Sequence, residues 1–99
     1  MISAQSVESI IFRAIEILNA ERPADQQIEI SSATRLFGVD AALDSLSLVS
    51  LISDVETTLN VEHRLSVSLA DDRAMSRPES PYTSVETLKN YILELTQGE

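Results

Sequence analysis

The tripeptide Asp44-Ser45-Leu46 is the segment whose residue types and position could support chemistry. Asp44 stands directly before an apolar-periodic run, where a helix N-cap is expected, so Ser45 would lie in the first helical turn. Backbone N–H groups at a helix start lack intrahelical partners and form the positive end of the helix dipole. An anionic group on the Ser45 hydroxyl would therefore be stabilised at this position.

Other arrangements that could do chemistry lack residues they need. Ser45, His63 and an acid are the residue types of a hydrolase triad. The sequence lacks the Gly-x-Ser-x-Gly turn and the preceding strand that would position such a serine. We therefore expect His63 to be solvated. Asp71-Asp72 lacks the spacing of a calcium loop and is interpreted as a solvated or capping pair. The chain has no cysteine and one histidine, which excludes thiol catalysis and histidine-rich metal sites. We expect no catalytic residue, no metal and no enzymatic activity.

An amphipathic helix is predicted from about Ser6 to Asn19, capped by Ser3 or Ser6, and Pro23 prevents its simple continuation. Its apolar residues recur at three- and four-residue steps: Val7, Ile10, Ile11, Ala14, Ile17 and Leu18. Residues 20–43 then form a long connection, of a length that is usually functional or disordered. We expect it to be ordered, because four apolar residues can hold it to the core: Ile28, Ile30, Leu36 and Phe37.

The second helix is predicted from the Asp44 cap to about Asn60, followed by extended chain over Val61–Leu69. Leu46 and Val49 lie on a flank that we expect to be partly buried. The core stripe of this helix is Leu48, Leu51, Ile52, Val55 and Leu59.

Two further helices are predicted after this segment. Residues 70–76 can form one or two turns, and Pro78 and Pro81 then break the chain. Thr83 and Glu86 form a capping box that opens the last helix, which Gly98 closes. The core face of that helix is Val85, Leu88, Tyr91, Ile92 and Leu95. The fold class is therefore all-α: a small four-helix bundle with three main helices and one short one.

Length and composition agree with one small domain, residues 1–99. Apolar residues make up 43% of the chain and aromatic residues 4%, so the core must consist of Leu, Ile and Val. A net charge of −9 opposes binding to nucleic acid and to anionic membranes. No apolar run is long enough to span a membrane, and the N-terminus has no secretory pattern. We expect a cytoplasmic monomer.

The motif Asp44-Ser45-Leu46, placed at the start of the second helix after a long connection, resembles the acyl carrier protein family. The resemblance covers nearly the whole chain, from the first amphipathic helix to the closing fourth helix. It implies that Ser45 receives a 4′-phosphopantetheine arm from coenzyme A. The enzyme that transfers the arm would be a Mg²⁺-dependent phosphopantetheinyl transferase, and Asp44 would assist the transfer reaction.

The resemblance further implies that the arm carries an acyl or aminoacyl group as a thioester and presents it to partner enzymes. Such partners would include acyl-activating ligases, synthases and transferases. Leu46 and Val49 match positions that the family exposes to these partners, and peripheral core packing remains an alternative for both residues.

Three departures from the family pattern favour a specialised fatty-acid, polyketide or related pathway over housekeeping fatty-acid synthesis. The nearest preceding glycine is Gly38, further from the serine than is usual in the family. The second helix carries little charge up to Asn60, where only Asp54 and Glu56 are acidic. Residues 70–82 form a long third-helix region. Two alternatives stay open: a peptidyl or aminoacyl carrier, and an unmodified acidic helical adaptor.

Overall fold

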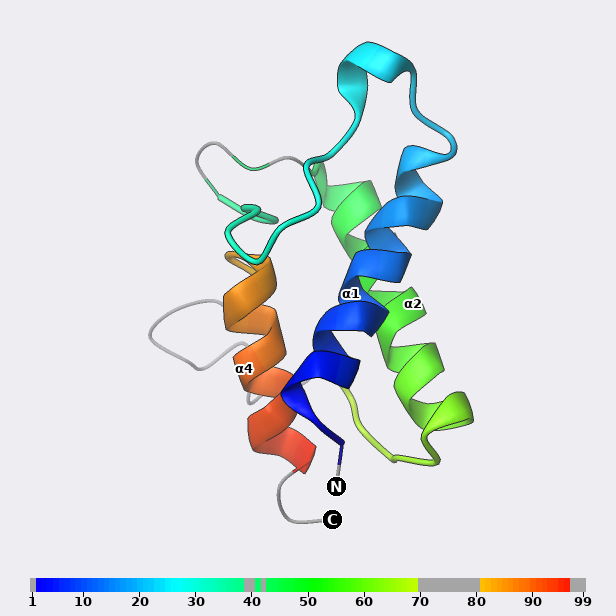
Figure 1. Cartoon of the computed structure of the whole chain (residues 1–99), viewed down its shortest axis with the longest axis vertical. Helices are drawn as coiled ribbons and strands as arrows, with labels where there is room; N and C mark the ends of the chain where they lie inside the picture. The colour runs from blue at the N-terminus through cyan, green and yellow to red at the C-terminus, as the bar shows by residue number, and fades with distance from the viewer. Residues whose placement is uncertain (1, 39–40, 42, 70–80, 97–99) are drawn as a thin grey trace.

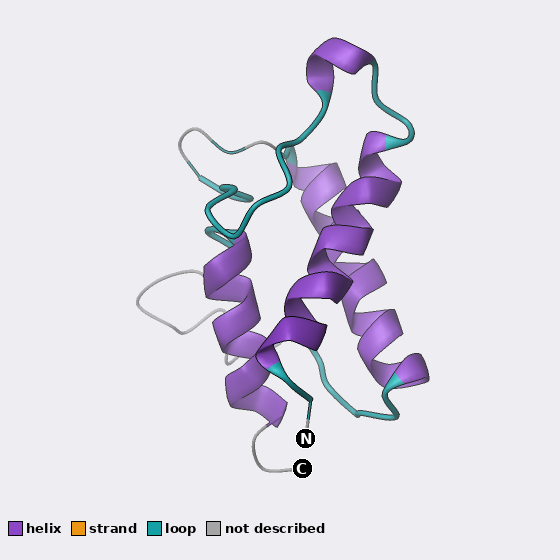
Figure 2. Cartoon of the chain, in the orientation of Figure 1, coloured by secondary structure: helices purple, strands orange, loops and turns teal. Residues whose placement is uncertain are grey.

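Three α-helices and one short 3₁₀ helix make up the regular structure of the described residues. The computed structural model describes residues 2–38, 41, 43–69 and 81–96, with Ser45 described by its backbone alone. In chain order the elements are α1 (Ala4–Asn19), η1 (Ala24–Gln26), α2 (Ser45–Glu62) and α4 (Val85–Thr96) (Figures 1 and 2). Within these ranges the chain is all-α and contains no strand. The short helix predicted in residues 70–76 and the predicted stop at Gly98 lie outside the described residues.

α1 is the central helix, because it packs against both α2 and α4 (Figure 1). Of its two predicted caps, Ser3 is the one used, and its hydroxyl accepts the N–H of Ser6 at 3.1 Å. Ile15 is fully buried, although it was not expected in the core, whereas Ile17 is 52% exposed. A helix that contacts two neighbours buries a wider stripe than a helix with one, which explains the inclusion of Ile15 four residues after Ile11.

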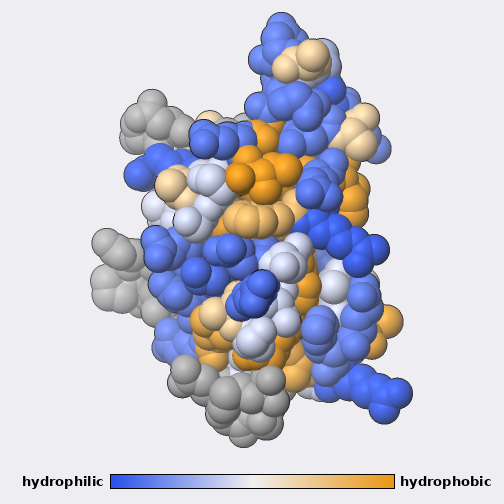
Figure 3. Space-filling model, viewed as in Figure 1, coloured by the Kyte–Doolittle hydropathy of each residue, from blue (hydrophilic) through white to orange (hydrophobic). Residues whose placement is uncertain are grey.

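The core combines aliphatic side chains from α1, α2 and α4 with others from the connecting segments, such as Leu36 and Leu69. Burying each such side chain stabilises the fold by about 1.5–3 kcal/mol relative to an exposed one. A half-buried ion pair between Lys89 and Glu8, at 3.6 Å, also joins α4 to α1. The face seen in Figure 3 alternates between hydrophilic and hydrophobic surface, with hydrophobic areas in its upper middle, in its lower middle and along the α2 side. The stripe predicted on α2 is buried throughout: Leu48, Leu51, Ile52, Val55 and Leu59.

The connection between α1 and α2 is tied to the start of α4 by backbone hydrogen bonds. The N–H groups of Val85 and Glu86 donate to the carbonyls of Thr34 and Ser32, both at 3.0 Å. The first N–H groups of a helix have no partner within the helix. The connection therefore supplies acceptors that α4 needs, and in return it is held against the bundle.

Two of the four apolar residues predicted to pin this connection are buried. Ile28 and Leu36 lie in the core, whereas Phe37 is 48% exposed and Ile30 is also exposed. The N–H groups of Leu36 and Phe37 both donate to the carbonyl of Thr83, at 2.8 and 3.4 Å, and the chain bends at Phe37, whose side chain stays outside the core. Near Ile30 a turn brings Thr34 inward instead, with its hydroxyl donating to the Glu29 carbonyl at 2.6 Å.

Asn19 and Asn60 fold the chain back after α1 and α2 by the same arrangement. The Asn19 amide donates to the carbonyl of Ile28 at 3.0 Å and accepts its N–H at 2.7 Å. The Asn60 amide does the same with Val67, at 3.1 and 2.9 Å. Ile28 and Val67 are both buried, so each asparagine satisfies a backbone that returns to the core.

The capping box of α4 lies one residue later than predicted. Ser84, rather than Thr83, accepts the N–H of Thr87 at 3.2 Å, and the Thr87 hydroxyl accepts the N–H of Ser84 at 2.9 Å. Glu86 was the predicted partner in the capping box, and its backbone N–H instead donates to the Ser32 carbonyl in the connection. Tertiary hydrogen bonds to the residues on either side of Ser84 set this register.

Candidate functional site

Asp44 ends the connection and caps α2, as the sequence predicts. Its Oδ1 accepts the backbone N–H of Ser47 at 2.7 Å, and its carbonyl accepts the N–H of Leu48 at 2.9 Å. Leu43 precedes the cap, and both Leu43 and Leu48 are buried in the core. These two leucines occupy the positions of a hydrophobic staple. Polar and apolar groups therefore together fix the direction in which the chain enters α2.

Hydrogen bonding lowers the pKa of the Asp44 carboxyl. The backbone N–H of Ser47 is the largest cause and the Ser47 side chain the next, while the positive charge of Arg22 acts in the same direction. The carboxyl is also exposed to solvent. Asp44 is therefore ionised at neutral pH, directly before Ser45.

Arg22 belongs to this site, although nothing in the sequence singles it out. Its guanidinium donates to the Ser47 hydroxyl at 3.3 Å and to the Gln26 carbonyl at 3.4 Å. The Gln27 amide donates to the Arg22 carbonyl at 3.0 Å, which holds the backbone of Arg22 in place. Arg22 and Ser47 are 25 residues apart, so no local pattern could have paired them.

The backbone of Ser45 begins α2, and the sequence predicts this position in the first helical turn. Leu46 and Val49 are 79% and 63% exposed, more than the partly buried flank that we expected. At 3.6 residues per turn, these two residues share one side of the helix with Ser50 and Ser53, and both serines are exposed as well. We call Leu46, Val49, Ser50 and Ser53 the uncharged stripe of α2. It lies opposite the buried stripe, which explains its exposure.

The geometry excludes a Ser45–His63 pair. Ser45 begins the 18-residue helix α2 and His63 is its C-cap, so the two lie about 27 Å apart along the helix axis. His63 is exposed, as expected. Among the described residues no group of three or more His, Cys, Asp or Glu side chains could hold a metal ion. Asp71-Asp72 lies outside those residues.

Comparisons of the chain with protein-family models, with curated proteins and with solved structures find no match. Within the described ranges, every helix is too short or too polar to cross a membrane.

Proposed function

We propose that this chain is a carrier protein, with a 4′-phosphopantetheine arm on Ser45 that holds an acyl or aminoacyl group. The observation that carries the proposal is the position of Ser45 at the start of α2, directly after the exposed and ionised cap Asp44. A phosphodiester at this position lies at the positive end of the helix dipole. The guanidinium of Arg22, bound to Ser47 in the same turn, adds positive charge.

Attachment is a simple transfer from coenzyme A. The Ser45 hydroxyl oxygen forms a bond to the phosphorus next to the pantetheine, the pyrophosphate bond of coenzyme A breaks, and adenosine bisphosphate leaves. The hydroxyl proton passes to a base of the transferase. When bound, the arm supplies a terminal thiol, which this chain lacks because it has no cysteine.

The uncharged stripe of α2 supports a dedicated partner enzyme in a specialised pathway. Glu56 is half-buried and accepts the N–H of Leu69 at 2.9 Å, so Asp54 and Glu62 are the exposed acids of α2. An enzyme that docks beside Ser45 would therefore make apolar contacts with Leu46 and Val49 rather than ion pairs. The net charge of −9 would still steer a basic partner over longer distances.

Intact-mass measurement tests this proposal. We expect the folded protein to gain the mass of one phosphopantetheinyl group after incubation with a phosphopantetheinyl transferase, coenzyme A and Mg²⁺. An unchanged mass, with a transferase that loads a known carrier in parallel, would contradict the proposal and favour the unmodified adaptor. Loading of the modified protein by amino-acid-activating rather than acyl-activating enzymes would identify an aminoacyl carrier.

A further inference from the structure

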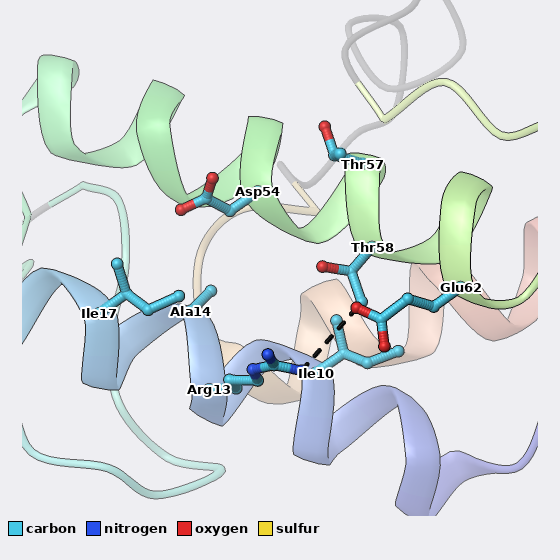
Figure 4. A pocket seen from close by; sticks show the side chains of 8 residues that line it. All are labelled: Ile10, Arg13, Ala14, Ile17, Asp54, Thr57, Thr58 and Glu62. Atoms are coloured by element: carbon cyan, nitrogen blue, oxygen red, sulfur yellow. Dashed lines mark ion pairs between the residues drawn. The ribbon is translucent and has the colours of Figure 1, made fainter.

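A shallow groove lies between α1 and the second half of α2 (Figure 4). Its volume is about 130 Å³. A cavity of about 150 Å³ accommodates a molecule the size of benzene, so the groove has room for one side chain. The lining residues on which the inference depends are Ile10, Arg13, Ala14, Ile17, Asp54 and Glu62.

The groove combines an apolar floor with a charged rim that carries Arg13, Glu62 and Asp54. Ile10 and Ala14 form the buried part of the floor, and the half-exposed Ile17 extends it at the end where Asp54 projects from α2 (Figure 4). At the other end Arg13 pairs with Glu62 at 3.8 Å. The carboxylate of Asp54 makes no hydrogen bond or ion pair with any other described residue, so it is available to a partner.

We infer that this groove is a docking site for a lysine side chain of a partner protein. A lysine has an apolar stem of four methylene groups and a charged head, and such side chains place the stem on apolar surface while the head stays at the polar edge. The stem would lie on Ile10, Ala14 and Ile17, and the ammonium group would reach Asp54. A neutral chain would fill the floor but leave that carboxylate unpaired.

This site goes beyond the proposed carrier function and does not depend on it. Asp54 is nine residues from Ser45, about 14 Å along the helix. The net charge of −9 favours the approach of a basic partner.

Two capped tripeptides, Ala-Lys-Ala and Ala-norleucine-Ala, test the inference by amide chemical-shift titration of the ¹⁵N-labelled protein. We expect the lysine peptide to shift the amides of Ile17, Asp54 and Thr58 saturably, and the norleucine peptide to bind about threefold more weakly. The Asp54→Asn variant should lose about threefold in affinity for the lysine peptide, the size of an exposed ion pair. Asp25→Asn, the same change in η1, should lose nothing.

A variant that binds the lysine peptide more tightly than wild type provides a second test. Arg13→Gln removes the cation that occupies Glu62, so we expect the lysine peptide to bind about twofold more tightly. Arg35→Gln makes the same charge change outside the groove and should have no effect. Equal affinity for the two peptides, or equal effects of the groove variants and their controls, would overturn the inference, as would an absence of saturable shifts at Ile17 and Asp54.

Discussion

The guanidinium of Arg22 donates a hydrogen bond to the hydroxyl of Ser47 at 3.3 Å and joins the chain after α1 to the first turn of α2. The carboxylate of Asp44 binds the backbone N–H of the same serine at 2.7 Å. A cation from the start of the connection and an anion from its end thus meet on Ser47. The start of α2, with Ser45 in it, is fixed from both sides.

The charge of Asp44 should make stability depend on pH. Asp44→Asn keeps a cap acceptor but removes the charge. Because the folded-state pKa is lowered below an unfolded value of about 4, ionised Asp44 stabilises the fold above that pH, and the contribution is lost as the pH falls through the folded-state pKa. We expect urea unfolding to show wild type more stable than Asp44→Asn at neutral pH, with the difference closing in acid. A difference that is constant with pH would contradict this.

Asn60 should be needed for the return of the chain after α2. Asn60→Ala removes both hydrogen bonds to Val67, whose buried backbone would be left without partners. We expect a loss of about 1–3 kcal/mol in the free energy of unfolding. Asn60→Asp keeps the acceptor and loses the donor, so its stability should lie between those of wild type and alanine. Denaturant midpoints measure all three, and an unchanged midpoint for Asn60→Ala would refute the bridging role.

The two sides of α2 should respond differently to truncation. Leu51 is fully buried, so Leu51→Ala should cost about 2–5 kcal/mol. Ser53 is exposed on the uncharged stripe, so Ser53→Ala should stay within about 0.5 kcal/mol of wild type. Equal unfolding midpoints for the two variants would mean that the helix register is wrong.

Features set by neighbouring residues were predictable from the sequence. The Asp44 cap follows from an acceptor placed directly before a periodic run, and the cap geometry confirms it. The buried stripe around Leu51 follows from helical spacing alone, because α2 turns one side to α1.

Features set by distant residues were not predictable. The contact of Arg22 with Ser47 spans the whole connection, and no periodic pattern encodes it. Periodicity places Ile15 and Ile17 equally close to the core face, and only the packing of other elements against α1 decides which of them is buried. The N-cap of α4 is Ser84 rather than the predicted Thr83 for the same reason, since long-range hydrogen bonds set its register.

The uncharged stripe should determine which enzymes accept the loaded protein. We expect enzymes that recognise acidic carriers to use wild type poorly, and the double variant Ser50→Glu, Ser53→Glu to raise their transfer rate. The gain should be larger at low salt, where charges are less screened. Leu46→Ser should instead slow the dedicated partner. Transfer rates measured against ionic strength decide this, and the absence of a gain at low salt would count against the stripe as a specificity surface.

The most direct test of the carrier proposal is the intact mass of Ser45→Ala after treatment with transferase, coenzyme A and Mg²⁺, beside wild type and Ser50→Ala. Ser50→Ala removes a hydroxyl from the same helix, and circular dichroism establishes that all three proteins are folded. We predict one added phosphopantetheinyl group on wild type and on Ser50→Ala, and none on Ser45→Ala. A modified Ser45→Ala protein, or a wild type that never gains mass, would contradict the assignment of Ser45 as the attachment site.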